Sequence, residues 1–224
     1  MQLIQIFSPQ ILVWLAMSLY TLCFLPQIIE NYRVKSGTGL SDYFLLAYLN
    51  TYITLNYYVF CLNLPIAYKI ACPAQGIATL ILISQRLYYN HSNNQDKLSG
   101  PKFSDSRFYG LIYITNLLGS LIFIPVAIVY PNHAGHIFGW ISFILILLNQ
   151  MPQVFRVIAT KSVAGFSYMF VLITAFAAGI ELYTSLALGL PMQTVLSAAR
   201  GLVYFAIFSV LFLLFKNNKI DIKN

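Results

Sequence analysis

Charged side chains are scarce in this sequence. Of its 224 residues, 8% are charged and 59% are hydrophobic, whereas ordinary globular domains carry about 25% charged residues. So few charges cannot cover the surface of a water-soluble fold, which excludes that class. The hydrophobic residues form continuous runs without the alternation typical of barrel strands, so the sequence predicts helices that cross a lipid bilayer.

Signatures of catalysis and of metal binding are also missing. The sequence has no glycine-rich phosphate loop followed by lysine, no nucleophile elbow and no paired intramembrane aspartates. Its three histidines fall in predicted loops, with no carboxylate or cysteine at ligand spacing. The cysteines lie inside apolar runs without metal-ligand spacing: Cys23, Cys61 and Cys72. We therefore expect a protein that is not an enzyme, uses no ATP, and holds no metal or cofactor.

Seven apolar runs approach the ~20 residues that a helix needs to cross ~30 Å of hydrocarbon. They cover residues 9–29, 40–62, 65–88, 108–130, 136–156, 165–188 and 191–215. Since a backbone N–H or C=O finds no water in lipid, each run is predicted to be helical.

A Pro-Gln pair occurs twice in the same setting, 126 residues apart, as Pro26-Gln27 and Pro152-Gln153. Each pair is followed by a Lys-Ser dipeptide, then by glycine and serine. One offset holding over such a span indicates an internal duplication. The same offset also relates Trp14 to Trp140, Phe44 to Phe170, Tyr57 to Tyr183 and Leu64-Pro65 to Leu190-Pro191.

The duplication divides the chain into two three-helix repeats. Residues 1–89 form the first, 90–107 a cytoplasmic loop, 108–130 a linker helix, and 131–224 the second repeat with a short tail. An odd number of helices per repeat would invert the second copy, and the linker helix restores its direction. We therefore predict an all-α membrane protein with two parallel three-helix repeats. Thr115 and Asn116 are the residues that would give the linker more than a connecting role.

Basic residues gather at one end of the predicted helices. Eleven of the thirteen lysines and arginines lie in the segments after the first, third, fifth and seventh helices or at the adjoining helix ends. The positive-inside rule then places the N-terminus outside and the C-terminus in the cytoplasm. The net charge of +7 indicates attraction to anionic lipid and not to nucleic acid. Short tails without a sorting signal favour a bacterial inner membrane over a lysosomal or vacuolar one.

The two Pro-Gln motifs, each ending a helix and followed by a basic-Ser-x-x-Gly-x-Ser loop, resemble those of the PQ-loop family. The resemblance covers nearly the whole chain. It implies the 3+1+3 helix arrangement shared by cystinosin-like transporters and SWEET sugar transporters, and alternating-access transport. The chain departs from the cystinosin-like pattern at about Thr174, where those proteins have a proton-coupling aspartate in the sixth helix.

The prolines are also predicted to act as hinges, because of their effect on a helix. Proline within a helix lacks an N–H and clashes with the carbonyl four residues earlier, so the helix bends there. Gln27 and Gln153 have amide groups that can satisfy the carbonyls freed by the bend. We predict a pair of gates or hinges at Pro26-Gln27 and Pro152-Gln153, the alternative being static kinks.

The substrate site is expected near the midplane, between the repeats. Polar side chains there are costly unless they face a cavity or one another. The predicted substrate-binding residues are Tyr48, Asn50, Thr51, Tyr52, Asn149, Thr174, Ala178, Glu181 and Arg200. The alternative for each is a hydrogen bond between helices. Tyrosines near helix ends are predicted to lie at the membrane interface instead: Tyr57, Tyr58 and Tyr130.

Glu181 and Arg200 are two charges inside predicted membrane helices. Counted from the turn that joins their helices, they reach nearly the same depth, ~12–14 Å at ~1.5 Å per residue. They are therefore expected to be able to pair, either as a solute or proton site or as a structural clamp.

Two functions from different classes remain. The first is an alternating-access secondary transporter or facilitator of a small polar solute, an amino acid or a related metabolite, with protons as a candidate coupling ion. A sugar uniporter of the SWEET type is a variant of it. The second is a non-transporting membrane receptor or scaffold of the same fold. The sequence leaves the oligomeric state undetermined.

Overall fold

The computed structural model describes residues 8–36, 40, 42–93, 115, 118–163 and 166–215, and all regular structure in these ranges is helical. The helices are α1 (Pro9–Leu22), α2 (Phe24–Val34), α3 (Asp42–Cys61), α4 (Ile66–Asn93), α6 (Ile124–Val129), α7 (Pro131–Asn149), α8 (Met151–Thr160), α9 (Tyr168–Ala187) and α10 (Met192–Phe215).

Five described segments are long and apolar enough to cross a membrane: Pro9–Val34, Ile66–Tyr89, Pro131–Thr160, Tyr168–Ala187 and Met192–Phe215. The first and third each combine two consecutive helices. Helix α3 has the length of a span, 20 residues, but asparagines, threonines and tyrosines in its middle lower its hydropathy. The linker region contains the shorter apolar helix Leu118–Val129.

The predicted start of the fifth span was wrong, and so was the prediction that the three histidines lie in loops. We expected a loop at 131–135, but α7 begins at Pro131, so His133 and His136 are helical, and His91 lies in α4. Proline suits the first position of a helix because the N–H it lacks would have no intrahelical partner there.

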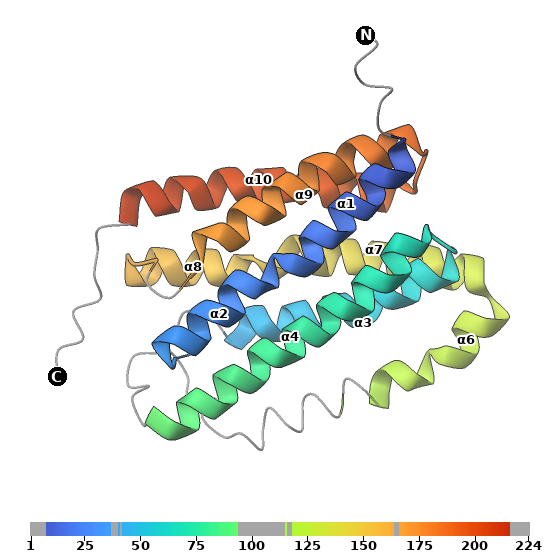
Figure 1. Ribbon diagram of the computed structural model, residues 1–224. Coiled ribbons are helices and arrows are strands. Elements are labelled where there is room, and N and C mark those ends of the chain that lie inside the picture. Colours follow the sequence, from blue (N-terminus) through green and yellow to red (C-terminus); the bar gives the residue numbers. More distant parts are fainter. Residues whose placement is uncertain are drawn as a thin grey trace, which may run out of the picture.

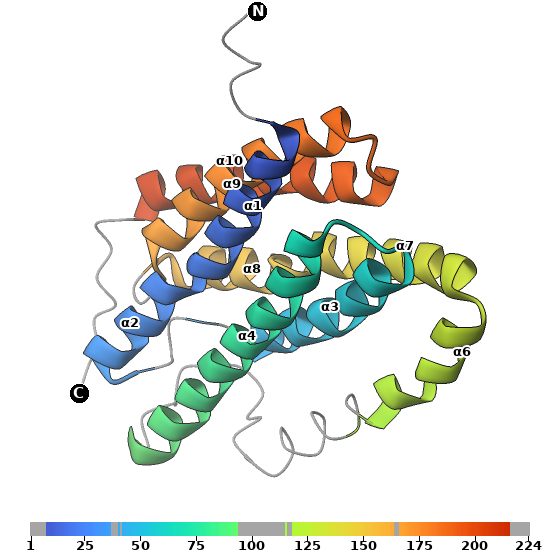
Figure 2. The same ribbon diagram turned by 45° about the vertical axis from the view of Figure 1, so that its right-hand side comes forward.

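Helices α1, α3, α4, α7, α9 and α10 pack side by side (Figure 1; Figure 2), and their contacts form a closed ring. In order around the ring, α1 packs on α9, α9 on α10, α10 on α7, α7 on α3, α3 on α4, and α4 on α1. The 126-residue offset converts α1, α3 and α4 into α7, α9 and α10, and it maps every contact in this ring onto another one. The two contacts between the repeats, α1 with α9 and α7 with α3, are therefore equivalent.

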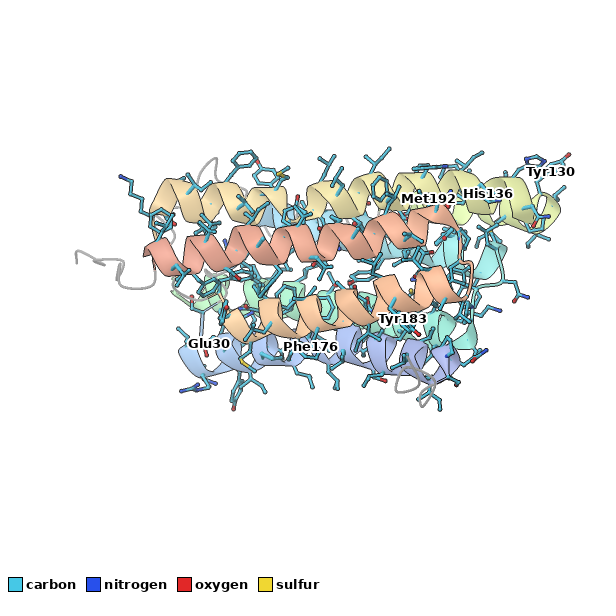
Figure 3. All side chains as sticks on the ribbon, turned by 90° about the horizontal axis from the view of Figure 1, so that it is seen from above. Glu30, Tyr130, His136, Phe176, Tyr183 and Met192 are labelled. Carbon is cyan, nitrogen blue, oxygen red and sulfur yellow. The ribbon has the colours of Figure 1, made fainter. Side chains whose placement is uncertain are left out.

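The two repeats run in the same direction, as predicted. In Figure 1, α1 and α7 both begin at the end of the bundle where α4 and α10 also begin. Glu30 lies near the opposite end from Tyr130 and His136, while Phe176 and Tyr183 project from the outer face of α9 (Figure 3). Phe176 is 74% exposed, which suits a side chain that faces lipid.

The duplication extends to the backbone conformation. Left-handed residues in the described chain form two matched pairs, Lys35 (φ 50°) with Lys161 (φ 48°) and Asn63 (φ 51°) with Gly189 (φ 59°). Such residues commonly end helices, because they turn the chain so that its next N–H groups reach the last free carbonyls. The glycines that follow the two Pro-Gln motifs, Gly39 and Gly165, lie outside the described residues.

Both proline motifs bend their helices. The break between α1 and α2 falls at Cys23, three residues before Pro26, and the break between α7 and α8 falls at Gln150, two residues before Pro152. These positions are where a proline ring and its missing N–H disturb the preceding turn. Each predicted bend therefore coincides with an interruption of its helix.

The linker helix lies outside the ring. Helix α6 has no buried residue and packs against α7 and α3, at the edge of the bundle in both ribbon views. Just before α6, the carbonyl of Ser120 accepts a hydrogen bond from the Tyr57 hydroxyl of α3. This position agrees with a connecting role. Thr115 is exposed, and Asn116 lies outside the described residues.

Close packing of α7 on α3 depends on small residues in α7. A Cβ atom added to Gly139 would lie 2.7 Å from Cδ2 of Tyr58, and one added to Gly135 would lie 2.5 Å from a methyl carbon of Leu62. Small residues four apart let membrane helices approach closely. The contact between repeats therefore tolerates little extra volume at this face.

We predict that Gly139→Ala destabilises the fold by roughly 1–3 kcal/mol, because the added methyl forces the Tyr58 ring to move. Thermal unfolding of the purified protein in detergent measures this loss. The control is Gly179→Ala in α9, where an added Cβ would meet no atom within 4 Å. It should be neutral or stabilise by up to about 1 kcal/mol. Equal unfolding temperatures for the two variants would contradict the packing argument.

Candidate solute-binding cavity

A cavity lies between the two repeats, at the centre of the ring. Side chains from α1, α3, α4, α7, α9 and α10 all line it, together with the residues at the break after α1. It leaves about 80 Å³ for the centres of water-sized groups, several times the ~10–15 Å³ that one water needs. A molecule in this cavity would touch both repeats.

The first repeat supplies the aromatic wall. Five tyrosines line the cavity, and all come from this repeat: Tyr20, Tyr48, Tyr52, Tyr58 and Tyr68. Phe24 packs edge-on against Tyr48 and Phe170, with ring centroids 5.9 Å and 5.8 Å apart. The rings are held by such contacts, and the hydroxyls give the wall polar positions.

The second repeat supplies the charges and most of the small polar groups. Its lining residues include Ser142, Asn149, Thr174, Glu181, Gln193, Thr194, Ser197 and Arg200. Repeat-matched positions face the cavity from both sides, but their chemistry differs. Leu55 matches Glu181, Tyr48 matches Thr174, and Tyr20 matches Ile146. The fold is therefore nearly symmetric, while the cavity is aromatic on one side and charged on the other.

Seven of the nine predicted site residues line the cavity: Tyr48, Thr51, Tyr52, Asn149, Thr174, Glu181 and Arg200. Asn50 does not, and its Nδ2 donates to the Leu46 carbonyl of its own helix at 3.0 Å. Ala178 is fully buried against α10, since its Cβ lies 2.6 Å from where a Cβ on Gly201 would be. Helical spacing predicted Ala178, and it does not separate a cavity face from a packing face, while Asn50 was predicted only as an amide group nearby.

Several lining residues were not predicted, mainly from α1, α4 and α10: Tyr20, Tyr68, Gln75, Gln193 and Thr194. Tyr58 was predicted to lie at the membrane interface, which is wrong. It is 3% exposed, and its hydroxyl lies 2.7 Å from the Thr194 hydroxyl. Applying the repeat offset to α4 and α10 would have found Tyr68 and Thr194, which occupy the same position in the two repeats. Tyr130 is 62% exposed, as expected near a membrane surface.

Glu181 and Arg200 face the same cavity without meeting. Within the described part of the chain, the ion pair within 4.0 Å joins Arg33 to Glu30 on the surface. Glu181 instead accepts a hydrogen bond from the Tyr68 hydroxyl at 3.1 Å. Arg200 donates through Nη1 to the Ile146 carbonyl at 3.0 Å. The predicted direct pair does not form, because each group is held by a partner on another helix.

Gln27 of the first proline motif hydrogen-bonds to the opposite repeat as well as to its own helix. Oε1 of Gln27 accepts the backbone N–H of Ser167 at 3.0 Å, and its Nε2 donates to Asn31 at 2.9 Å. Asn31 in turn donates to Gln85 of α4 at 3.3 Å. Gln27 thus joins the first repeat to the start of α9 in the second. Gln153, its counterpart, is also fully buried.

The chain is similar to known proteins along most of its length. The PQ loop repeat family matches residues 9–68 and 134–194, more than half of the chain. An uncharacterized protein of Schizosaccharomyces pombe is 27% identical over 196 residues, which cover 85% of this chain and 66% of that protein. A eukaryotic SWEET transporter structure is similar in fold, with a TM-score of 0.65 and 15% identity, over 94% of this chain and 99% of that one.

We predict that Tyr68 and Glu181 are energetically coupled and that Glu181 and Arg200 are coupled less. Removing one partner of a hydrogen bond to a charged group costs about 1.5–3 kcal/mol. The effects of Tyr68→Phe and Glu181→Gln on unfolding free energy should therefore be strongly non-additive. The effects of Glu181→Gln and Arg200→Gln should be closer to additive. The opposite order of coupling energies in these two double-mutant cycles would contradict the observed contacts.

Proposed function

The chain belongs to the PQ-loop repeat family, and on that premise we propose that it is an alternating-access transporter or facilitator of a small polar solute, an amino acid or a related metabolite. The observation that supports this best is the position of the cavity. It is lined by all three helices of each repeat, so rocking one repeat against the other would change its access while a solute stays bound. The SWEET transporter of similar fold agrees with this proposal.

The proposed solute contacts are the lining residues on the two chemically different walls. Tyr48, Thr51 and Tyr52 offer hydroxyls and rings from α3, and Thr174, Glu181 and Arg200 offer polar and charged groups opposite. Asn149 is 2% exposed, and among the described residues its Oδ1 has no hydrogen-bond partner. A buried amide oxygen is costly when unpaired, so a bound solute or water would stabilise it. Glu181 is the proposed proton carrier if uptake depends on a proton gradient.

Gating is proposed to occur at the proline motifs. The Gln27 bond to Ser167 ties the bent half of the first long helix to the opposite repeat, so it would have to break when that end opens. Pro26 and Pro152 then act as hinges, and Gln27 and Gln153 as gate residues. The basic residues near this end, including Lys35 and Lys161, support a cytoplasmic location.

The experiment is uptake into proteoliposomes that contain the purified chain, with a panel of neutral and charged amino acids, sugars and organic acids. We expect saturable uptake of a zwitterionic or anionic metabolite. Uptake confined to sugars would favour a uniporter of the SWEET type, and intact protein that moves no solute would favour a receptor or scaffold. Asn149→Ala should weaken uptake, whereas the matched change Asn50→Ala, outside the cavity, should leave it largely unchanged.

We predict that Pro26→Ala and Pro152→Ala slow uptake while the protein still folds. Alanine restores the missing N–H and favours a straight helix by up to about 3 kcal/mol relative to proline, so it opposes bending. The measurements are initial uptake rates in proteoliposomes and the unfolding temperature in detergent. Normal rates in both single variants and in the double variant would remove the hinge proposal.

We also predict the orientation of the chain. A cysteine introduced at Asn93 in a cysteine-free background should react with a membrane-impermeant thiol reagent only from the cytoplasmic side. One introduced at Asn132 should react only from the other side, since the basic end of the bundle faces the cytoplasm. Intact cells and inside-out vesicles provide the two sides. The reverse labelling pattern would overturn the assignment.

A further inference from the structure

The break between α7 and α8 leaves backbone carbonyls that another helix satisfies. In a regular helix the Ile146 carbonyl would accept the N–H of Gln150, but that N–H is directed to the Leu148 carbonyl. Nη1 of Arg200 donates to the Ile146 carbonyl at 3.0 Å, and the Tyr204 hydroxyl donates to the Leu147 carbonyl at 2.5 Å. Both donors lie one turn apart on α10. These two hydrogen bonds attach the last turn of α7 to α10.

The first repeat has no equivalent of these two donors. The 126-residue offset maps Arg200 to Ala74 and Tyr204 to Ala78, and alanine side chains cannot donate hydrogen bonds. At the interruption of the first long helix, the N–H of Cys23, which the offset maps to Asn149, keeps its regular bond to the Leu19 carbonyl at 2.8 Å. The Tyr20 carbonyl, which matches that of Ile146, accepts a bond from the Cys23 thiol of its own helix. The two interruptions therefore differ both in backbone hydrogen bonding and in the side chains that support them.

We propose that Arg200 and Tyr204 form a clamp that fixes the bend between α7 and α8, and that an anionic group in the cavity, such as a carboxylate, loosens this clamp by drawing the Arg200 guanidinium away from the Ile146 carbonyl. The part that concerns the carboxylate rests on the proposed function, because it makes the cavity a solute site. The part that concerns the clamp does not. Arg200 is thus a positioning residue that links cavity occupancy to one of the two bends.

The chemistry of Arg200 supports this coupling. Its side chain lines the cavity, and no carboxylate of the described chain lies within 4.0 Å of it, since the ion pair at that distance is Arg33 with Glu30. A neutral carbonyl is a weaker acceptor for guanidinium than a carboxylate, which can engage two N–H groups at once. An incoming carboxylate therefore competes favourably with Ile146. The Tyr204 hydroxyl is uncharged, so it would keep its hydrogen bond to the Leu147 carbonyl. This remaining bond would guide the turn of α7 back to its original position.

Hydrogen exchange of the purified full-length protein in detergent tests the clamp without any knowledge of the solute. Arg200→Gln and Tyr204→Phe should each accelerate exchange of the amides at residues 146–153. The increase for Arg200→Gln should be roughly ten- to hundredfold, the size implied by losing one hydrogen bond to a charged group. Exchange at residues 19–27 around the first bend should not change. Tyr204→Phe keeps the ring, so it provides the test if Arg200→Gln fails to fold.

The matched controls are Arg33→Gln, which removes a surface arginine, and Tyr183→Phe, which removes the hydroxyl of a tyrosine that is 42% exposed. Neither should alter exchange at residues 146–153. Unchanged exchange there in Tyr204→Phe and Arg200→Gln alike would overturn the clamp. Equal acceleration at both bends would also overturn it, because it would indicate general loosening of the bundle.

The carboxylate is tested with acetate and its neutral isostere acetamide, both small enough for the cavity, at equal ionic strength. Acetate should accelerate exchange at residues 146–153 of the unaltered protein, acetamide should not, and Arg200→Gln should abolish the difference. Equal effects of the two probes would overturn the anion coupling and leave the clamp standing. If the proteoliposomes show no uptake while acetate still acts through Arg200, the proposed transport function fails and the coupling remains.

Discussion

Every buried backbone N–H and C=O of this chain needs a partner inside the protein, because lipid provides none. Most of the fold follows from this constraint. It makes each apolar run a helix, and it makes each interruption of a helix a place where side chains must act. The interruptions at Cys23 and Gln150 are caused by prolines that remove a donor and distort the turn before them. Where the Ile146 carbonyl loses its regular donor, Arg200 replaces it, and Tyr204 donates to the neighbouring Leu147 carbonyl.

The duplication explains why the bundle closes. Each repeat alone leaves one face of its first and second helices without a neighbour, and the pseudo-twofold arrangement places those faces on each other as α1 on α9 and α3 on α7. The backbone has this symmetry even at the left-handed residues that end its helices, which occur at matched positions. The side chains did not. Five tyrosines stand on one side of the cavity, and Glu181 and Arg200 on the other, so the two halves cannot be equivalent toward a bound solute.

Periodicity and the repeat offset predicted the helices, their parallel arrangement and the bends, because these depend on the length of apolar runs and on proline. The same signals predicted the α3 and α9 sides of the cavity. They did not identify Tyr68 or Tyr58, because distance along one helix does not show which neighbour a residue faces. They also suggested that Glu181 and Arg200 could pair, because the sequence indicates only how deep each residue lies in the membrane, and these two depths are nearly equal. The direction of each side chain depends on its own partners, Tyr68 for one and Ile146 for the other.

An arginine inside a membrane protein is expensive to bury, and a structural clamp alone does not require one, since a tyrosine performs the same task one turn away on α10. On the proposed function the positive charge has a second role, because Arg200 also lines the cavity in which the solute would bind. In the first repeat the position that matches Arg200 is Ala74. The tyrosine rings of that repeat, on the other side of the cavity, offer a negative face to a cation. On the proposed function, a solute with a negative and a positive end would meet Arg200 with the first, and Glu181 or the tyrosine rings with the second. The different side chains of the two repeats would then fix the orientation of the solute. The backbone around it is nearly symmetric, which would still allow one repeat to rock against the other.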